Sequence, residues 1–302
     1  MVTPDIFSAE DLLSKPDLFA GFEPPVRLAV IGDPIAHSKS PAFQNAALHA
    51  CGIPVAYARL HVPPSEFAKV LRALPGAGFL GANVTIPHKA SALAGVDVAD
   101  AYARASGSVN TIVVSGEKLH GFNTDGPGIS RAIREEFSRD LRDLRVVLVG
   151  AGGGAGRAIA VQCAMEKCAR LVLVNRTFEK AQLLAAELAP YFLSEPTSGS
   201  LDRVCAITFE DGDLRRELEN ADILINATSL GMNRSDGPVV PASHLHTNLL
   251  VYDTVYTRGG SRLIDDAAAV GARGANGLGM LLHQGALAFE IWFNRPAPLA
   301  VM

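Results

Sequence analysis

The chain has 302 residues, of which 48% are hydrophobic and 19% are charged. This balance excludes disordered and fibrous proteins, and the length fits two ordinary globular domains. The 27 basic and 31 acidic side chains give a net charge of -4 without a dense basic tract, which argues against binding to nucleic acid.

The four cysteines show no C-x-x-C spacing, and three of them lie in apolar stretches; they are Cys51, Cys163, Cys168 and Cys205. We therefore expect reduced thiols, no zinc and a cytoplasmic protein. The first 25 residues interleave acids and prolines with apolar residues, unlike an export signal. No apolar stretch reaches the roughly 20 residues that a membrane-spanning helix needs, so no membrane partner is expected.

The first half of the chain alternates predicted strands and helices. Strands are predicted over residues 27–32, 55–62 and 81–87, followed by helices that begin near Ser40, Pro64 and Lys89. Ser40 is expected at the N-cap of its helix, with Pro41 at the first helical position. Such repetition indicates a mainly parallel α/β sheet.

Residues 108–124 have a different pattern. They contain two short strand-like runs joined by Ser115 and Gly116, which predicts a hairpin that adds antiparallel pairing to the sheet. The first domain is expected to end near Asp125.

A second series begins after a helix predicted over residues 127–139. Residues 145–177 form a new strand–helix–strand unit with its own glycine-rich turn. Further strands are predicted over residues 204–208, 221–228 and 248–256 and near Arg273. Residues 277–293 follow as one apolar helix, which composition alone assigns to neither domain.

The glycine-rich turn predicts a dinucleotide site. Gly150, Gly152 and Ala155 satisfy G-x-G-x-x-G/A directly after an apolar strand, where glycines let backbone amides approach a pyrophosphate at a helix N-terminus. The run is one residue longer than the usual turn. Which of Gly150, Gly152, Gly153 and Gly154 meets the phosphates is therefore left open.

The next strand favours NADP over NAD. It ends in Asn175, Arg176 and Thr177, where an NAD-binding protein would place an acid for the ribose hydroxyls. Arg176 and Lys180 would instead bind a 2′-phosphate through charge-assisted hydrogen bonds. The alternative is that Thr177 caps a helix and both cations are solvated.

Six separated motifs occur in order along the chain. They are VIGDPIAHSKSP at 30–41, GANVTIPHK at 81–89, SVNTI at 108–112, GFNTDG at 121–126, INATSLGM at 225–232 and NGLGMLLHQGALAFEIW at 276–292. Together they resemble the shikimate dehydrogenase family over residues 27–293. The resemblance implies NADP-dependent reversible reduction of 3-dehydroshikimate to shikimate, a step of aromatic amino-acid biosynthesis. It also implies a substrate domain of residues 1–125 with 277–302, to which the C-terminal helix returns, and a Rossmann-type NADP-binding domain of residues 126–276.

The resemblance implies that Lys89 and Asp125 are the catalytic pair. Hydride transfer to a ketone builds negative charge on oxygen, which an ammonium can stabilise and protonate while a carboxylate orients that ammonium. A neighbouring carboxylate also favours the charged form of Lys89, as a proton donor requires.

By the same resemblance, six polar side chains hold the substrate. Ser38, Ser40 and Tyr256 would bind its carboxylate, and Thr85, Asn110 and Gln284 would bind its ring hydroxyls. Alternatives remain for three of them. Ser40 would act only as an N-cap. Asn110 is expected within a strand and would only satisfy a neighbouring turn, and Gln284 would be an exposed helical residue.

The family lines the nicotinamide side of the cofactor with residues that follow a strand. Here these are Asn226, Thr228, Gly231 and Met232, with Gly277 and Met280 close to the same ring. Met280 has an alternative place in the helix core, which is the commoner position of a Met on an apolar face. No role is assigned to His37, His61, His88 or His283, which lack ligand spacing.

The sequence leaves other readings open. The segment TRGGSRLI after Tyr256 departs from the family pattern of a Pro and a Thr, so the hinge near the last strand is expected to be built differently. One alternative is a quinate or dual quinate/shikimate dehydrogenase that uses NAD, and another is a non-catalytic sensor of a shikimate-like ligand. The first residues of the chain, about 25 in number, are an N-terminal extension without a counterpart in compact bacterial members of the family, with capping of the sheet or mediation of contacts as its alternative roles. The sequence also leaves a homodimer open.

Overall fold

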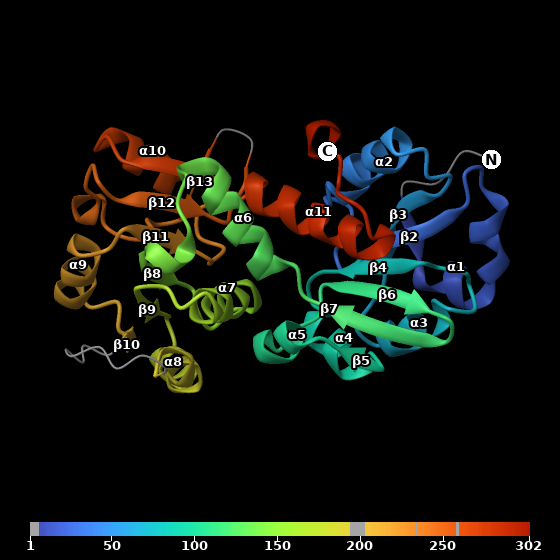
Figure 1. The fold of residues 1–302 in the computed structure, drawn as a ribbon, viewed down its shortest axis with the longest axis horizontal. Helices are drawn as coiled ribbons and strands as arrows, with labels where there is room; N and C mark the ends of the chain where they lie inside the picture. The colour runs from blue at the N-terminus through green and yellow to red at the C-terminus, as the bar shows by residue number, and fades with distance from the viewer. Residues whose placement is uncertain (1–5, 194–202, 234, 258–259) are drawn as a thin grey trace. The chain divides into compact units, whose positions relative to one another are not determined.

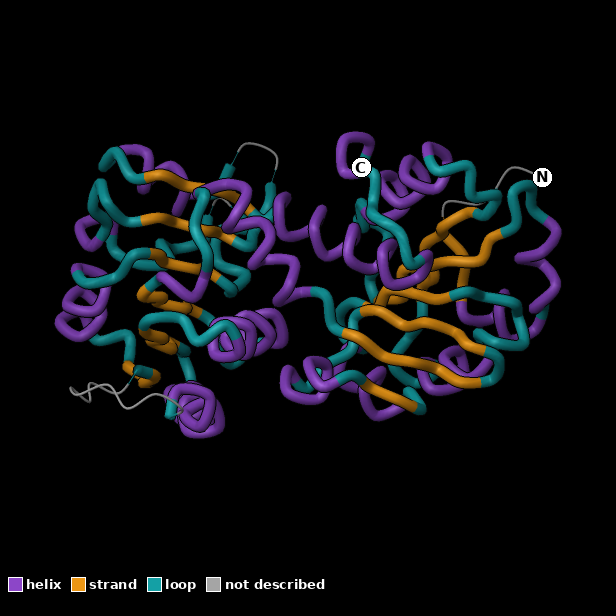
Figure 2. Tube along the Cα trace, in the orientation of Figure 1, coloured by secondary structure: helices purple, strands orange, loops and turns teal. Residues whose placement is uncertain are grey.

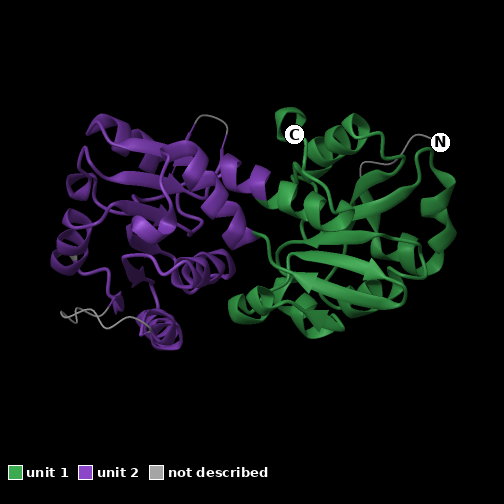
Figure 3. Ribbon diagram, in the orientation of Figure 1, with its two compact units in different colours: residues 1–124, 284–302 green, residues 125–283 purple. Residues whose placement is uncertain are grey.

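The computed structural model describes residues 6–193, 203–233, 235–257 and 260–302. The chain forms two compact units (Figure 3). Unit 1 comprises residues 1–124 and 284–302, and unit 2 comprises residues 125–283. Each unit has its own sheet and its own hydrophobic core.

The described residues of unit 1 form a seven-stranded mixed sheet in the order β1-β3-β2-β4-β6-β7-β5 (Figures 1 and 2). The strands are β1 (Ile6–Ser8), β2 (Val26–Gly32), β3 (Ala56–His61), β4 (Gly81–Val84), β5 (Val98–Ala99), β6 (Thr111–Ser115) and β7 (Lys118–Phe122). The helices are α1 (Ala9–Ser14), α2 (Ser40–Ala50), α3 (Phe67–Ala73), α4 (Lys89–Gly95) and α5 (Ala101–Ser106).

The predicted hairpin is confirmed, but its turn residues are Gly116 and Glu117, because Ser115 is the last residue of β6 and pairs with Lys118. β6 runs antiparallel to both β4 and β7, whereas the other neighbouring strands of the sheet pair in parallel. Gly116 takes the turn with a φ of 59°, a left-handed conformation that glycine adopts without steric cost.

Three predicted positions in unit 1 are wrong. Ser40 is the first residue of α2 rather than its N-cap, because Lys39 already has helical dihedral angles and occupies the cap position without a side-chain hydrogen bond. The helix expected near Pro64 begins at Phe67, after a turn. Asn110 precedes β6 instead of lying within a strand.

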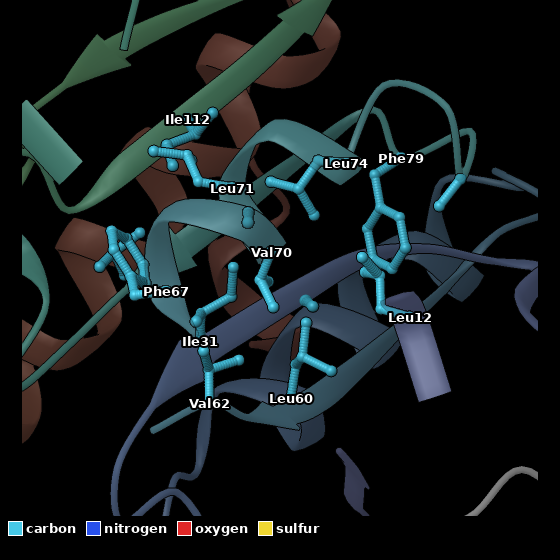
Figure 4. Close-up of a cluster of buried hydrophobic side chains, with 14 of the residues drawn as sticks. Leu12, Ile31, Leu60, Val62, Phe67, Val70, Leu71, Leu74, Phe79 and Ile112 are labelled. Carbon is cyan, nitrogen blue, oxygen red and sulfur yellow. The ribbon is translucent and has the colours of Figure 1, made fainter. Parts of the chain in front are cut away.

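The N-terminal residues are part of the core of unit 1. Phe7 and Phe19 are buried, and their ring centroids lie 4.9 Å apart, while Phe19 lies 5.1 Å from Phe79. Figure 4 shows part of this core, in which side chains of α3 face those of β2 and β3. The opposite face of the sheet carries a second cluster that includes Leu28, Tyr57 and Phe289.

The described residues of unit 2 form a six-stranded parallel sheet in the order β10-β9-β8-β11-β12-β13 (Figure 1). The strands are β8 (Arg145–Val149), β9 (Arg170–Val174), β10 (Val204–Ile207), β11 (Ile223–Asn226), β12 (Leu250–Asp253) and β13 (Arg273–Asn276). The helices are α6 (Asp125–Phe137), α7 (Gly154–Met165), α8 (Phe178–Leu188), α9 (Asp211–Glu219), α10 (Arg262–Ala269) and α11 (Leu278–Phe293). This strand order is that of the Rossmann fold, with its switch point between β8 and β11.

Helix α11 belongs to both units. Its first residues pack on α6, where a Cβ added at Gly279 would lie 3.3 Å from the side chain of Ala132. Its later residues lie in unit 1, where Trp292 Nε1 donates to the carbonyl of Ile112 at 2.9 Å and Gln44 Nε2 donates to the carbonyl of Gly285 at 2.8 Å. The predicted return of the C-terminal helix to the first unit is confirmed.

The described ranges contain neither a membrane-spanning helix nor a cluster of metal-ligating side chains. Among these residues no helix combines the length and the apolar character needed to cross a bilayer. The same residues contain no group of three or more His, Cys, Asp or Glu that could hold a metal ion.

Candidate active site

Polar side chains of unit 1 gather at one edge of its sheet. Asn83 at the end of β4 is opposite Thr111 at the start of β6, and Thr111 is opposite Phe122 at the end of β7. β2 runs parallel to β4, so the segment that follows β2 reaches the same edge. Ligand sites of α/β sheets form at the carboxyl ends of parallel strands, which is where these segments meet.

The segment after β2 carries two of the predicted substrate residues. Ser38 is half-buried, and its hydroxyl accepts a hydrogen bond from the N–H of Ser40 at 3.3 Å. Arg59 of β3 donates from Nε and Nη2 to the carbonyl of Ser38, at 3.1 and 2.7 Å. The conformation of this segment is therefore fixed by a neighbouring strand as well as by its own turn.

Thr85 lies beside the end of β2. Its N–H donates to the carbonyl of Ile31 at 2.9 Å, and a Cβ added at Gly32 would lie only 2.6 Å from the Thr85 methyl group. Glycine at position 32 is thus what allows Thr85 to approach this closely. The predicted substrate residues Ser38 and Thr85 thus follow two adjacent strands, β2 and β4.

His88 supports the turn before Lys89. It is buried, its ring stacks on Phe67 with centroids 4.4 Å apart, and its Nε2 contacts the carbonyl of Val62 at 2.7 Å. Burial lowers the pKa of His88, so a neutral ring that donates from Nε2 fits this site. His88 is a structural residue, and the sequence analysis gave it no other role.

Lys89 and Asn110 are held side by side through the backbone. Lys89 is the first residue of α4, and its carbonyl accepts from the N–H of Val109 at 3.0 Å. Asn110 Oδ1 accepts from the N–H of Thr124 at 2.8 Å and from the hydroxyls of Thr124 and Thr111 at 3.1 and 3.0 Å. Its oxygen is committed to the protein, so Asn110 can act toward a ligand only as a donor.

A buried hydrogen-bond network lies beneath these residues. Tyr57 donates to Asn83 Oδ1 at 2.8 Å, and Asn83 Nδ2 donates to Thr111 Oγ1 at 3.1 Å. Burial raises the pKa of Tyr57, which keeps its hydroxyl protonated as a donor. Tyr57 and Arg59 were not predicted from the sequence to have a role. Both are polar and lie two residues apart on a strand that otherwise reads as apolar, and this alternation was the available indication.

The glycine-rich turn of unit 2 joins β8 to α7. Gly150 has a φ of 90°, and a Cβ added there would lie 2.7 Å from the methyl group of Thr228. A Cβ added at Gly156 would lie 2.1 Å from the carbonyl oxygen of Gly150. Gly156, which was missed from the sequence, therefore allows the close helix–strand packing of the third position of the pattern, which the sequence had placed at Ala155, because the turn contains one extra residue.

A cavity of about 800 Å³ opens beside this turn. It is lined by the segments that follow β8, β9, β10 and β11: Gly150, Gly152, Gly153, Asn175, Arg176, Thr177, Phe178, Lys180, Thr208, Phe209, Ala227, Thr228, Ser229, Leu230, Pro238 and Val239. Asn175 braces the turn, since its Oδ1 accepts from the N–H of Gly152 at 3.2 Å and its Nδ2 donates to the carbonyl of Thr177 at 2.9 Å. Thr177 occupies the N-cap of α8 without a side-chain cap bond.

The cavity fits a phosphorylated dinucleotide. Gly153 caps the N-terminus of α7, whose unpaired N–H groups favour an anion, and a Cβ added at Gly154 would meet open space. Arg176 and Lys180 are exposed at the cavity, and within the described ranges neither side chain has a hydrogen bond or an ion pair. Two unpartnered cations and no acid at the end of β9 match a ribose 2′-phosphate.

A second buried network fixes the segment after β11. Asn226 Nδ2 donates to Asp253 Oδ1 at 2.8 Å, and its own Oδ1 accepts from the Thr228 hydroxyl at 2.7 Å. Ser261 donates to Asp253 Oδ2 and also caps α10. Burial raises the pKa of Asp253. Ser261 thus supplies a hydroxyl at the unusual TRGGSRLI segment, of which residues 258–259 lie outside the described residues.

The other predicted residues of unit 2 have different environments. Met232 and Tyr256 are exposed, whereas Met280 is buried and its N–H donates to the Tyr252 hydroxyl at 2.9 Å. A Cβ added at Gly277 would lie 2.0 Å from the carbonyl oxygen of Thr254, so packing alone requires this glycine.

The predicted site residues are divided between the units. Unit 1 contains Ser38, Ser40, Thr85, Lys89, Asn110 and Gln284, of which the last is on α11. Unit 2 contains Asp125, Tyr256 and all of the predicted cofactor residues. Asp125 is the first residue of α6 and follows Thr124 directly, whose N–H and hydroxyl are held by Asn110.

Three family models match successive parts of the chain. Residues 30–112 match the shikimate dehydrogenase substrate binding domain, residues 132–248 match shikimate / quinate 5-dehydrogenase, and residues 277–302 match the shikimate 5′-dehydrogenase C-terminal domain. Together they cover both units.

Full-length relatives are similar along almost the whole chain. A shikimate dehydrogenase (NADP(+)) of Methanopyrus kandleri is 41% identical over 277 residues, which cover 91% of this chain and 92% of the relative. That of Moorella thermoacetica is 41% identical, with 91% and 90% covered. The solved shikimate 5-dehydrogenase of Thermus thermophilus, in complex with NADP(H) and shikimate, is 32% identical with a TM-score of 0.79, and 91% of this chain and 96% of that one are covered.

Proposed function

The chain belongs to the shikimate dehydrogenase family, and from this premise we propose that it catalyses the reversible NADP-dependent reduction of 3-dehydroshikimate to shikimate. This reaction is a step of aromatic amino-acid biosynthesis. The observation that carries the proposal is the polar edge of unit 1, where Ser38, Thr85, Lys89 and Asn110 come from adjacent strand ends. Such an edge suits a ligand with several hydroxyls and one carboxylate.

Each unit has one task in this proposal. Unit 1 is the substrate domain, and unit 2 is the NADP-binding domain. Bound NADPH supplies the hydride for the ketone of the substrate. Gly150, Gly152, Gly153 and Gly154 provide the turn and the helix N-terminus for the pyrophosphate, and Asn175, Arg176, Thr177 and Lys180 hold the adenosine end with its 2′-phosphate. Thr228, Met232, Gly277 and Met280 line the nicotinamide end.

Lys89 protonates the substrate oxygen in the reducing direction. As the ketone gains a hydride, negative charge develops on its oxygen, and the Lys89 ammonium stabilises that charge and then donates a proton. In the oxidising direction the neutral amine accepts the hydroxyl proton. Asp125 orients the ammonium.

The remaining polar residues hold the substrate in register. Ser38, Ser40 and Tyr256 bind the carboxylate, and Thr85, Asn110 and Gln284 bind the ring hydroxyls. Ser40 is supported in this role because it is the first residue of α2 and makes no capping bond there. Asn110 donates from its side-chain amide to a ring oxygen, since its side-chain oxygen Oδ1 already accepts from Thr111 and Thr124. A site of this kind rejects analogues that lack one hydroxyl, because the unmatched polar group stays buried without a partner.

The protein acts in the cytoplasm on a small-molecule substrate, as a monomer or a homodimer. Cys163 and Cys168 are buried, which fits thiols that pack as small hydrophobic groups in a reducing compartment. Sedimentation at several protein concentrations distinguishes the two assembly states.

Steady-state kinetics of Lys89→Ala test the proposed acid. Loss of a general acid should lower kcat by about 10²–10⁴-fold while the KM for shikimate changes only a few-fold, because the group acts mainly in the transition state. Lys69→Ala is the matched control, since Lys69 is an exposed cation on α3. If Lys89→Ala keeps the turnover of the control, Lys89 is not the acid.

Substrate and cofactor choice are tested separately. The parent enzyme should oxidise shikimate with NADP, and activity confined to quinate with NAD would refute the proposed reaction. Arg176→Asp should shift the ratio of kcat/KM for NADP over NAD toward NAD by at least tenfold, because the acid repels the 2′-phosphate and accepts from ribose hydroxyls. An unchanged ratio would remove Arg176 from the cofactor site.

A further inference from the structure

We infer that Arg59 is a positioning residue that adds a positive charge behind the segment of Ser38 and Ser40, which also contains Lys39. The inference rests on the proposed function, because that function assigns the substrate carboxylate to Ser38, Ser40 and Tyr256. All three assigned partners are neutral hydroxyls. A carboxylate that leaves water for such partners loses hydration energy that neutral donors only partly replace.

Arg59 contacts the same segment directly. Its guanidinium donates from Nε and Nη2 to the carbonyl oxygen of Ser38, at 3.1 and 2.7 Å. This contact places a permanent positive charge against the residue that is assigned to the carboxylate. Lysine would not reproduce it, because a planar fork with two adjacent donors is a property of the guanidinium group.

The position of Arg59 on β3 explains how it reaches this segment. Side chains two residues apart on a strand share a face, and on this face Tyr57 bonds to Asn83 at 2.8 Å, while His61 bonds to Asp33 at 2.9 Å. Arg59 lies between them, with its register partner Val30 on β2. The side chains on one face of β3 therefore bond to three segments at the polar edge of unit 1. Tyr57 bonds to Asn83, Arg59 to Ser38 and His61 to Asp33.

The helix after Ser38 adds to the same electrostatic effect. α2 has 11 residues, and its N-cap Lys39 provides no side-chain bond to the first turn. The positive end of the helix dipole then acts on the same place as the Arg59 charge. Together they favour an anionic ligand over a neutral ligand of the same shape.

The preference for an anionic over a neutral substrate distinguishes an electrostatic role of Arg59 from a role that only supports the loop at Ser38. If Arg59 only holds Ser38 in place, its loss weakens a charged and a neutral substrate alike. If its charge acts on the carboxylate, its loss weakens the charged substrate more. Shikimate and its methyl ester form the required pair, since they differ in the charge of one group and leave the ring hydroxyls unchanged.

The experiment compares Arg59→Met, Arg59→Lys and the parent enzyme with both substrates and NADP. In Arg59→Met the KM for shikimate should rise about tenfold with kcat within about threefold, and the preference in kcat/KM for shikimate over the ester should fall at least fivefold. Arg59→Lys should keep that preference within about twofold while its KM for shikimate rises, because it keeps the charge and loses the fork. The KM for NADP should not change in either variant.

Arg27→Met is the matched control. Arg27 also lies in unit 1 and also donates to a loop carbonyl, that of Ala77 at 3.1 Å, but it stands at the amino end of β2. Its substrate preference should equal that of the parent. Thermal unfolding of all variants identifies any loss of the folded state, in which case Arg59→Gln, which keeps polar donors and removes the charge, carries the comparison with the same expected fall in preference.

Two results would overturn the inference. One is an equal loss of activity on shikimate and on its ester in Arg59→Met, and the other is no loss on either. Failure of the proposed function is a different result, namely a parent enzyme that does not oxidise shikimate with NADP. The two failures are therefore distinguishable in one set of assays.

Discussion

Replacement of Gly156 by Ala should both destabilise unit 2 and weaken cofactor binding. The new Cβ would lie 2.1 Å from the carbonyl oxygen and 2.8 Å from the carbonyl carbon of Gly150, and 3.0 Å from Cα of Ala151. All three are backbone atoms between β8 and α7, so no flexible side chain can move aside. Overpacking of this kind costs roughly 1–3 kcal/mol, and the rigid neighbours favour the upper end. Alanine recovers about 1 kcal/mol through its higher helix propensity, which leaves a net loss of about 2 kcal/mol.

Urea denaturation followed by circular dichroism measures this loss, and initial rates at varied NADP measure the KM. Because the clash pushes α7 away from the turn, the KM for NADP should rise about tenfold. Gly154→Ala is the matched control on the same helix, since a Cβ at Gly154 has no heavy atom within 4 Å. It should keep the stability of the parent, and a raised KM for NADP would then identify Gly154 as a point of close cofactor approach. A Gly156→Ala enzyme with parental stability and KM would refute the packing argument.

Two further predictions concern stability. Phe19→Ala should lower the free energy of unfolding, measured by urea denaturation, by about 3–5 kcal/mol, because it empties a core position between Phe7 and Phe79. Leu13 is exposed, so the control Leu13→Ala should cost less than about 0.5 kcal/mol. Asp222 accepts from the backbone N–H and the side chain of Arg145, which lowers the pKa of that carboxyl. Its stabilisation is therefore present above the unfolded pKa of about 3.9 and is lost as pH falls through the lower folded value. Asp222→Asn should cost less than about 1 kcal/mol at pH 7, given solvent screening, and the difference from the parent should vanish in strong acid; a difference that grows on acidification would contradict the assignment.

The sequence predicts much of the architecture because its local signals agree with the tertiary environment. Apolar runs predict the strands of unit 2, the glycines after β8 predict the turn at Gly150, and the parallel order follows from the strand–helix alternation. The hairpin around Gly116 is predicted from its turn residues alone. In each of these places one short segment carries the whole signal.

The errors arise where residue preferences do not determine the backbone conformation or the packing. Ser40 has the chemistry of an N-cap, yet the backbone of Lys39 is already helical, which no residue preference reveals. Phe7 and Phe19 belong to a segment without helical or strand periodicity, and only their contacts with one another and with Phe79 make them core residues. The role of Gly156 depends on counting one extra residue in a run of glycines.

In the proposed site of unit 1, too, some residues are visible in the sequence and others only through their contacts in the structure. The proposed site residues Lys89, Thr85 and Asn110 are recognisable because each stands in a motif, whereas Tyr57 and Arg59, which bond to neighbouring segments, stand on a strand that reads as ordinary core. Tyr57 is a buried aromatic residue by sequence, and only the structure gives its hydroxyl a partner in Asn83, whose amide in turn bonds Thr111.

This arrangement has a physical reason. Segments at the carboxyl ends of strands leave backbone groups that no ladder satisfies, so a site built there needs donors and acceptors from elsewhere to hold its shape. A neighbouring strand supplies them at low entropic cost, because its own backbone is already fixed by pairing on both sides. β1 completes that pairing for β3 and is itself contributed by the N-terminal extension. The extension would then support substrate binding without contacting the substrate, through the rigidity of the strand that carries Tyr57, Arg59 and His61.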